Sequence, residues 1–230
     1  VDMLLGFHLR PIEECPMGKA VPAMYYSASA TVEVDFNGKA AHAARPHLGI
    51  NALDAAALAV QAVNGIHLSP SLTWSAKATR FLCDAGVTNS IPATARVCWD
   101  LRSAENEGMA ELKTRVLRAI EGSAAALGAI ADIRILKEMP AAIIDDEATE
   151  VIREAIVEVL GEEGLTDPKS TPGSEDFFHY LRLRPQVKGG FWGLGANLTP
   201  GLHHPDMHFD REALALGVQV FKACVRRVLG

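Results

Sequence analysis

Residues 29–37 read Ser-Ala-Thr-Val-Glu-Val-Asp-Phe-Asn. Val32, Val34 and Phe36 alternate with polar side chains in this stretch, and a period of two is typical of a β-strand that buries one face. Residues 72–79, 94–101 and 131–135 alternate in the same way. The pattern therefore predicts four strands, each apolar on one side only.

Two segments between these strands carry apolar residues at helical spacing. One series runs from Ile50 to Val63 and the other from Met109 to Leu127, and each predicts an amphipathic helix. Residues 29–136 then follow the order β-α-β-β-α-β, which is typical of a ferredoxin-like split βαβ sandwich. The polar sheet face should stay solvated or meet a polar partner, and an edge could pair with a second copy. We therefore expect a homodimer.

The flanks have a different pattern, that of an α/β layer. Val1–Phe7 is a near-continuous apolar run that predicts a strand buried on both faces, and Gly189–Gly195 is a second such run. Helices are predicted over residues 147–160, 174–183 and 211–228. Residues 1–27 and 138–230 would form one α/β domain, interrupted by the α+β unit of residues 28–137.

Two strands are too few for a sheet that buries both faces, because typical sheets have about four to six. The chain also opens at Val1 directly in an apolar run, with no turn or helix before it. Both features predict that part of this domain lies upstream of the 230 residues.

The composition is that of an ordinary globular protein. The chain has 230 residues, 49% of them hydrophobic, and a formal net charge of −6 from 22 Lys+Arg and 28 Asp+Glu. This balance gives no electrostatic support for binding nucleic acid or an anionic membrane. The four cysteines are widely and irregularly spaced, which favours reduced thiols and a cytoplasmic location. Small molecules and a second protein chain are the expected partners.

His42 and Arg102 are candidate functional residues of the middle segment. His42 lies in Asn37–Pro46, where small residues leave the backbone close to whatever the imidazole faces. A lone histidine in such a loop is more often a cap of the following helix. Arg102 ends a predicted strand that begins after Asn89-Ser-Ile-Pro92, and an arginine there is more often in a surface ion pair than in a ligand contact.

Three further candidates lie in the flanks. His8 follows the first apolar run, at the strand end where open α/β sheets place their sites, although it could equally be a core histidine. Residues 201–210 contain three histidines and two aspartates, which are metal-ligand types, but Asp210 could also be a plain helix N-cap. Glu175 stands in Ser174-Glu-Asp176, where Ser174 could likewise be a helix N-cap with acids in the first turn.

Taken together, five ordered motifs resemble those of a known family. They are Gly6-x-His8-x-x-Pro11, Gly38-Lys-Ala-Ala-His42-Ala-Ala-x-Pro46, Asn89-x-Ile-Pro92 leading to Arg102, Gly173-Ser-Glu-Asp-Phe177, and Leu202-His203-His204-Pro205. The sequence resembles the dinuclear metal-dependent amidohydrolases and exopeptidases, which include aminoacylases, carboxypeptidase G and hydrolases of indoleacetyl-amino acid conjugates. The likeness runs from Val1 to the C-terminus and is greatest to the aminoacylase and indoleacetyl-amino acid hydrolase branch.

The resemblance implies a function and roles for the matched residues. The activity would be hydrolysis of an amide bond in an N-acyl amino acid, with two divalent metal ions, Zn, Mn or Co, in an intact active site. His8 and His203 match terminal metal ligands. His42 matches a lid histidine that reaches across a homodimer to steady the oxyanion of the tetrahedral intermediate. Asn89 and Arg102 match residues that hold the substrate carboxylate, and Glu175 lies near the site.

Family members also use a bridging metal ligand and a Glu-Glu pair that supplies the general base, and these lie upstream of the first matched motif. The implied fold is a complete ferredoxin-like lid and dimerisation domain inserted in a truncated catalytic domain of the zinc-exopeptidase type. The 230 residues alone would then lack activity. The alternative is a non-enzymatic dimerising or binding module that keeps the fold and binds no metal.

Overall fold

Two units make up the chain in the computed structural model, which describes residues 1–230. Unit 1 comprises Val1–Tyr26, Ala142–Thr171 and Glu175–Gly230, and unit 2 comprises Ser27–Ala141 and Pro172–Ser174. The sequence placed the second domain boundary between residues 137 and 138. In the structure this boundary lies after Ala141, because residues 138–141 belong to unit 2.

Unit 2 is built on a four-stranded antiparallel sheet with strand order β6-β8-β4-β9. The strands are β4 (Ala28–Asn37), β6 (Trp74–Leu82), β8 (Thr94–Ser103) and β9 (Ile130–Met139). All four predicted strands are therefore present. The strand expected at 72–79 begins later and runs further, because β6 stays paired with β8 past a register shift between Ala78 and Arg80.

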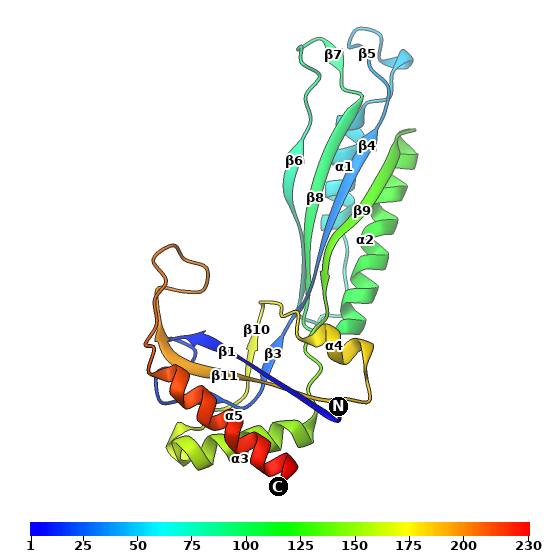
Figure 1. Ribbon diagram of the computed structural model, residues 1–230. Helices are drawn as coiled ribbons and strands as arrows, with labels where there is room; N and C mark the ends of the chain where they lie inside the picture. Colours follow the sequence, from blue (N-terminus) through cyan, green and yellow to red (C-terminus); the bar gives the residue numbers. More distant parts are fainter. The chain divides into compact units, whose positions relative to one another are not determined.

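Two helices cover one face of this sheet (Figure 1). They are α1 (Ala52–Asn64) and α2 (Asn106–Ala126), and the side chain of Asn51 accepts a hydrogen bond from the backbone N–H of Leu53 to cap α1. Val32, Val34 and Phe36 are fully buried beneath the helices. The predicted βαββαβ order is confirmed.

Short elements at one end of unit 2 were not predicted from the sequence. The strand β5 (Ala41–His42) pairs with β7 (Ser90–Ile91), and a 3-10 turn η1 (Pro46–Leu48) follows β5. Two-residue strands are too short to show a period of two. They nevertheless bring the loops at 38–51 and 83–93 together, and we call these two loops the tip of unit 2.

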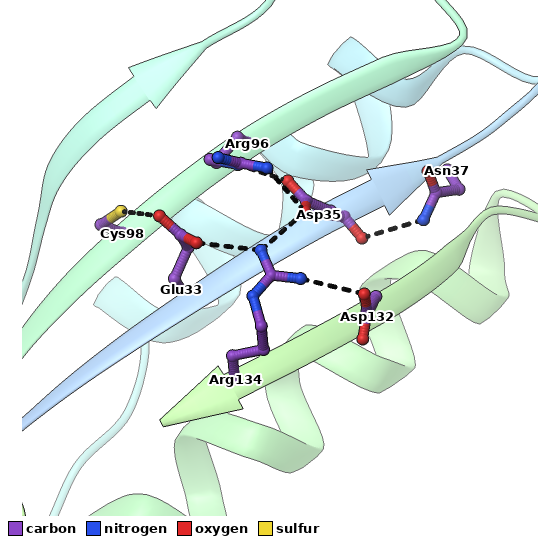
Figure 2. A network of polar contacts seen from close by, with 7 residues as sticks. All are labelled: Glu33, Asp35, Asn37, Arg96, Cys98, Asp132 and Arg134. Atoms are coloured by element: carbon purple, nitrogen blue, oxygen red, sulfur yellow. Dashed lines mark hydrogen bonds and ion pairs between the residues drawn. The ribbon is translucent and has the colours of Figure 1, made fainter. Parts of the chain in front are cut away.

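The uncovered face of the sheet carries a network of ion pairs (Figure 2). The guanidinium of Arg134 donates to Glu33 at 2.9 Å, to Asp35 at 2.6 Å and to Asp132 at 2.9 Å. Arg96 binds Asp35 with two hydrogen bonds of 2.6 and 2.9 Å. Alternation along the strands puts all these side chains on one face, so the predicted polar sheet face is present.

Acid should weaken this network. The bond from Arg134 lowers the pKa of Glu33, and the bonds from Arg96 lower that of Asp35. A carboxyl group whose pKa falls on folding stabilises the folded state above its unfolded pKa of about 4, and that contribution is lost as the pH falls through the lower, folded pKa. We expect amide protection in β4, measured by hydrogen exchange, to fall from pH 5 to pH 3, and Arg134→Gln to lower it already at neutral pH.

The matched control for that measurement is Arg118→Gln, which removes the same charge from an exposed site on α2. Arg118 has no ion pair, so this variant should keep the pH profile of the wild type. An Arg134→Gln protein that loses as much protection between pH 5 and pH 3 as the wild type would contradict the role of the network.

Unit 1 contains two small sheets. In the first, β1 (Met3–Pro11) runs parallel to β11 (Lys188–Leu198), and β2 (Ala20–Val21) pairs antiparallel with β11. In the second, β3 (Met24–Tyr26) runs parallel to β10 (Lys169–Thr171). The sequence predicted only β1 and β11, because the other three strands have two or three residues each.

The helices of unit 1 are α3 (Asp146–Leu160), α4 (Phe178–Leu183) and α5 (Ala213–Leu229), with a 3-10 turn η2 (Glu162–Gly164). Trp192 and Leu194 of β11 pack with α3 and α5, whereas Phe191 packs with α4. Alternate residues of β11 thus enter two separate cores, which confirms the predicted buried strand. No helix of the structure is both long and apolar enough to cross a membrane.

The expectation that the first strand is buried on both faces is met only in part, because Leu5 and Phe7 pack against one core and Leu4 against another without full burial. β1 is an edge strand with β11 as its one neighbour, and its residues from Met3 to Leu9 are only half-buried. Two apolar hollows open along it, of about 430 Å³ beside Leu5 and α5 and about 350 Å³ beside Leu4 and α4. An apolar parallel strand normally has neighbours on both sides, so this edge has the character of an interior strand.

Candidate functional site

His8 lies within β1, three residues before its end, and not beyond the strand as the sequence suggested. Its Nδ1 lies 2.7 Å from the carbonyl oxygen of Leu9. A carbonyl only accepts, so Nδ1 carries a proton, and in the neutral ring Nε2 keeps its lone pair. Metal-ligating histidines commonly hold their second ring nitrogen in this way, which fixes the tautomer and the ring. The geometry of His8 therefore fits a metal ligand.

Glu175 lies in unit 1 ahead of α4 and within electrostatic reach of His8. Its Oε1 accepts hydrogen bonds from the backbone N–H groups of Asp176 at 3.0 Å and Phe177 at 3.5 Å. Burial is the main cause that raises the pKa of Glu175, and nearby Asp176 adds to it. A half-buried carboxyl group can accept a proton or hold a cation.

The alternative that Ser174 caps a helix is wrong. The residue before α4 is Phe177, no side chain caps this helix, and the hydroxyl of Ser174 bonds instead to the hydroxyl of Ser29 at 3.0 Å. Both serines belong to unit 2.

His203 lies in the exposed loop between β11 and α5. Its φ of +64° is in the left-handed region, which histidine enters more readily than most residues. Its ring makes no hydrogen bond. The ring of His204 is already engaged, because Nδ1 accepts from the backbone N–H of Asp206 at 3.1 Å. Of the two neighbours, His203 is therefore the one whose ring nitrogens are both free.

The other members of the 201–210 cluster hold the loop in shape. His208 exchanges two backbone hydrogen bonds of 3.0 Å with Thr199, and its Nδ1 lies 3.1 Å from the carbonyl oxygen of Asp206. Asp210 accepts from the N–H of Glu212 at 3.0 Å, but Glu212 is the residue before α5, so Asp210 is not the helix N-cap.

A complete metal site is not formed by these residues. The structure contains no group of three or more His, Cys, Asp or Glu side chains arranged to hold a metal ion. All four cysteines are free thiols, and burial raises the pKa of Cys15 and of Cys224 to about 11, so neither is a ready thiolate ligand. The donor set of unit 1 thus fits individual metal ligands such as His8, but it does not close a coordination shell.

His42 and Asn89 lie side by side at the tip of unit 2. His42 pairs with Ser90 across β5 and β7, and the N–H of Ala43 donates to the carbonyl oxygen of Asn89 at 2.9 Å. The Nδ1 of His42 accepts from the N–H of Ala44 at 3.0 Å, so the neutral ring carries its proton on Nε2. His42 caps neither η1 nor α1, and its exposed Nε2–H is a free hydrogen-bond donor.

Arg102 lies at the other end of β8. It forms an ion pair with Asp100, as expected if it is a surface arginine. Its Nε and Nη2 donate to the two carboxylate oxygens of Asp100 at 2.8 and 3.0 Å. Sequence reasoning missed Asp100, although Asp100-Leu-Arg102 in a strand puts both charged side chains on one face.

The structure does not bring Arg102 together with His42 and Asn89 within one copy of unit 2. Thr94 begins β8 next to the tip, and Arg102 follows eight residues later, which is about 26 Å along a strand. Figure 1 shows β5 and β7 at the opposite end of unit 2 from the end of β8. One amino-acid ligand cannot span that distance.

Comparison with family models identifies the family of the chain. The model of peptidase family M20/M25/M40 matches residues 6–227. N-acetyldiaminopimelate deacetylase from Streptococcus thermophilus is 30% identical over 94% of this chain and 57% of its own length. N-acetyl-L-cysteine deacetylase from Bacillus subtilis is 27% identical over 100% of this chain and 54% of its own length.

A solved structure has the same fold. It is a dinuclear metal binding peptidase of the M20 family from Bacillus subtilis, with a TM-score of 0.79 and 23% identity over 100% of this chain and 58% of that one. The chain thus spans little more than half the length of each of these three proteins.

Proposed function

The chain belongs to peptidase family M20/M25/M40, and on that premise we propose that its protein hydrolyses the amide bond of N-acyl amino acids. The family makes it a hydrolase, and two relatives with deacetylase names support an N-acyl amino acid as substrate. The observation that carries the proposal is the state of His8, whose ring is held through Nδ1 with Nε2 left free. That arrangement suits a metal-ligating histidine, which is the role that the resemblance of Gly6-x-His8-x-x-Pro11 implies for His8.

His8 and His203 would hold divalent ions, Zn, Mn or Co. Such ions, when bound, polarise a carbonyl group and lower the pKa of water. His203 suits this role better than His204, because the Nδ1 of His204 accepts from the N–H of Asp206 and the proton of the neutral ring is then on Nε2. Glu175, within electrostatic reach of His8, would contact the substrate or the ions through a carboxylate held by two backbone N–H groups.

Residues of unit 2 would bind and polarise the substrate. The free Nε2–H of His42 is a donor suited to the oxyanion that develops as the amide carbonyl is attacked. Asn89 lies beside it and could bind the substrate through its amide. Arg102 would bind the substrate carboxylate, because two of its five N–H groups remain after its bonds to Asp100 and to the carbonyl oxygen of Pro172.

We propose that the active form is a homodimer through unit 2. The distance between Arg102 and the tip supports this arrangement, because only a second copy could bring His42 of one chain to a site that contains Arg102 of the other. The outer face of α1 carries one charge, Asp54, and exposes Leu53 and Leu58, and the neighbouring edge strand β6 exposes Phe81 and Leu82. An apolar helix face beside an unpaired edge strand suits contact with a second copy.

The general base and the bridging metal ligand would come from a further part of the same protein. The interior character of the β1 edge supports this. A further apolar strand beside β1 would fill both hollows. The 230 residues by themselves would then be inactive, and we expect the complete protein to act in the cytoplasm.

A hydrolysis assay of the full-length protein tests this proposal. It should release amino acids from a panel of N-acetyl amino acids, lose activity with a chelator, and regain it with Zn, Mn or Co. The alternative, a binding module without metal, predicts no turnover and no metal in elemental analysis. That result, or hydrolysis unaffected by the chelator, would contradict the proposed function.

A further inference from the structure

Arg102 is held along one edge of its guanidinium. Asp100 accepts from Nε and from Nη2, one bond to each carboxylate oxygen, so the contact is bidentate on the side edge of the group. The Nη1 group donates to the carbonyl oxygen of Pro172 at the longer distance of 3.4 Å. The planar guanidinium is thereby fixed from two sides, and it keeps two N–H groups without a protein partner.

Asp100 makes no other side-chain hydrogen bond or ion pair. This separates it from Asp35, which forms the same bidentate contact with Arg96 but shares a carboxylate oxygen with Arg134. Asp35 therefore belongs to a network that links three strands of the sheet. Asp100 and Arg102 lie on the same strand, and both side chains are 35% exposed. An ion pair within one strand does not connect neighbouring strands. The Asp100–Arg102 pair therefore contributes little to the stability of the sheet.

We infer that Asp100 is a positioning residue that presents Arg102 to the carboxylate of a ligand. This inference rests on the proposed function, because it assumes that the ligand of Arg102 is the carboxylate of an N-acyl amino acid. A long arginine side chain loses rotamer freedom when it binds, and holding it in place beforehand removes that loss from the binding step. Asp100 also balances the charge of Arg102, so recognition would depend on the geometry of two hydrogen bonds more than on net charge.

The test compares Asp100→Asn with the wild type in the full-length protein. Asparagine has the shape of aspartate but turns an N–H₂ group toward one of the guanidinium donors, so the bidentate contact cannot form. We expect KM for N-acetyl-L-alanine to rise about tenfold, with kcat changed less than about twofold. The corresponding carboxamide, N-acetyl-L-alaninamide, has no carboxylate, so its KM should not change.

Asp35→Asn is the matched control, because it breaks the same kind of bidentate pair on the same sheet face. It should lower the melting temperature and leave KM for N-acetyl-L-alanine unchanged. A merely structural role for Asp100 would make the two variants behave alike. An Asp100→Asn protein with unchanged or lower KM, or with equal changes for the acid and the amide, would overturn the inference.

Binding of a ligand that cannot be hydrolysed separates this inference from the proposed function. The probe is the ketone analogue of N-acetyl-L-alanine, in which CH₂ replaces the amide N–H, measured by calorimetry. Tenfold weaker binding to Asp100→Asn would support the positioning role even if the wild type hydrolysed nothing, and the proposed function alone would then fail. Equal binding to both proteins, or no binding to either, would overturn the inference.

Discussion

Replacing His203 by alanine should lower kcat/KM of the full-length protein more than about 100-fold, because loss of even an outer partner of a metal ligand typically costs 10- to 100-fold. The same change at His204 should lower it less than about threefold, since the Nδ1 of that ring accepts from the N–H of Asp206 and its Nε2 then carries the proton. The two residues are neighbours in one exposed loop. Comparing the two variants therefore distinguishes loss of a metal ligand from a change in loop structure.

Elemental analysis should accompany these rates. We expect His203→Ala to retain less metal than the wild type and His204→Ala to retain the same amount. His8→Ala should resemble His203→Ala, because its free Nε2 is the second proposed terminal ligand. A His204→Ala protein that loses metal and activity while His203→Ala keeps both would reverse the assignment of the motif.

The sequence predicted the parts of the fold whose elements are long and half-buried. Val32, Val34 and Phe36 are fully buried and alternate with the charged residues of the network, so a period of two is plain in β4. The strands β5 and β7 have two residues each. Their pairing depends on contacts between loops far apart in the chain, and no local pattern encodes such contacts. The juxtaposition of His42 and Asn89 could therefore not be predicted.

The length of β1 explains why the sequence predicted His8 beyond the strand, whereas His8 lies within it. The apolar run ends at Phe7, but the strand continues to Pro11, because its backbone stays paired with β11. Arg10 is buried there with its guanidinium bound to Glu14 and to the hydroxyl of Tyr26. A buried and fully paired arginine looks like a surface residue in the sequence. Hydropathy does not show that Glu14 neutralises this charge, so hydropathy alone ends such a strand too early.

Mixing two inactive variants should restore activity if each active site uses residues of two chains. His42→Ala lacks the donor at the tip of unit 2, and His203→Ala lacks a proposed metal ligand of unit 1. In a dimer of one chain of each kind, one site has both changes and the other has neither, provided that His42 acts across the dimer. Random pairing makes half of the dimers mixed, so about a quarter of wild-type activity should return.

The control is a mixture of His203→Ala with His8→Ala. Both residues belong to unit 1, so every site in a mixed dimer still lacks one proposed metal ligand, and no activity should return. Restoration in the first mixture and none in the second can arise only if residues of the two units meet across chains. The separation of Arg102 from His42 along β8 also requires two chains for the proposed site, because one copy of unit 2 cannot bring both residues to one substrate. Activity in the first mixture no higher than in its components would place His42 outside the partner's site.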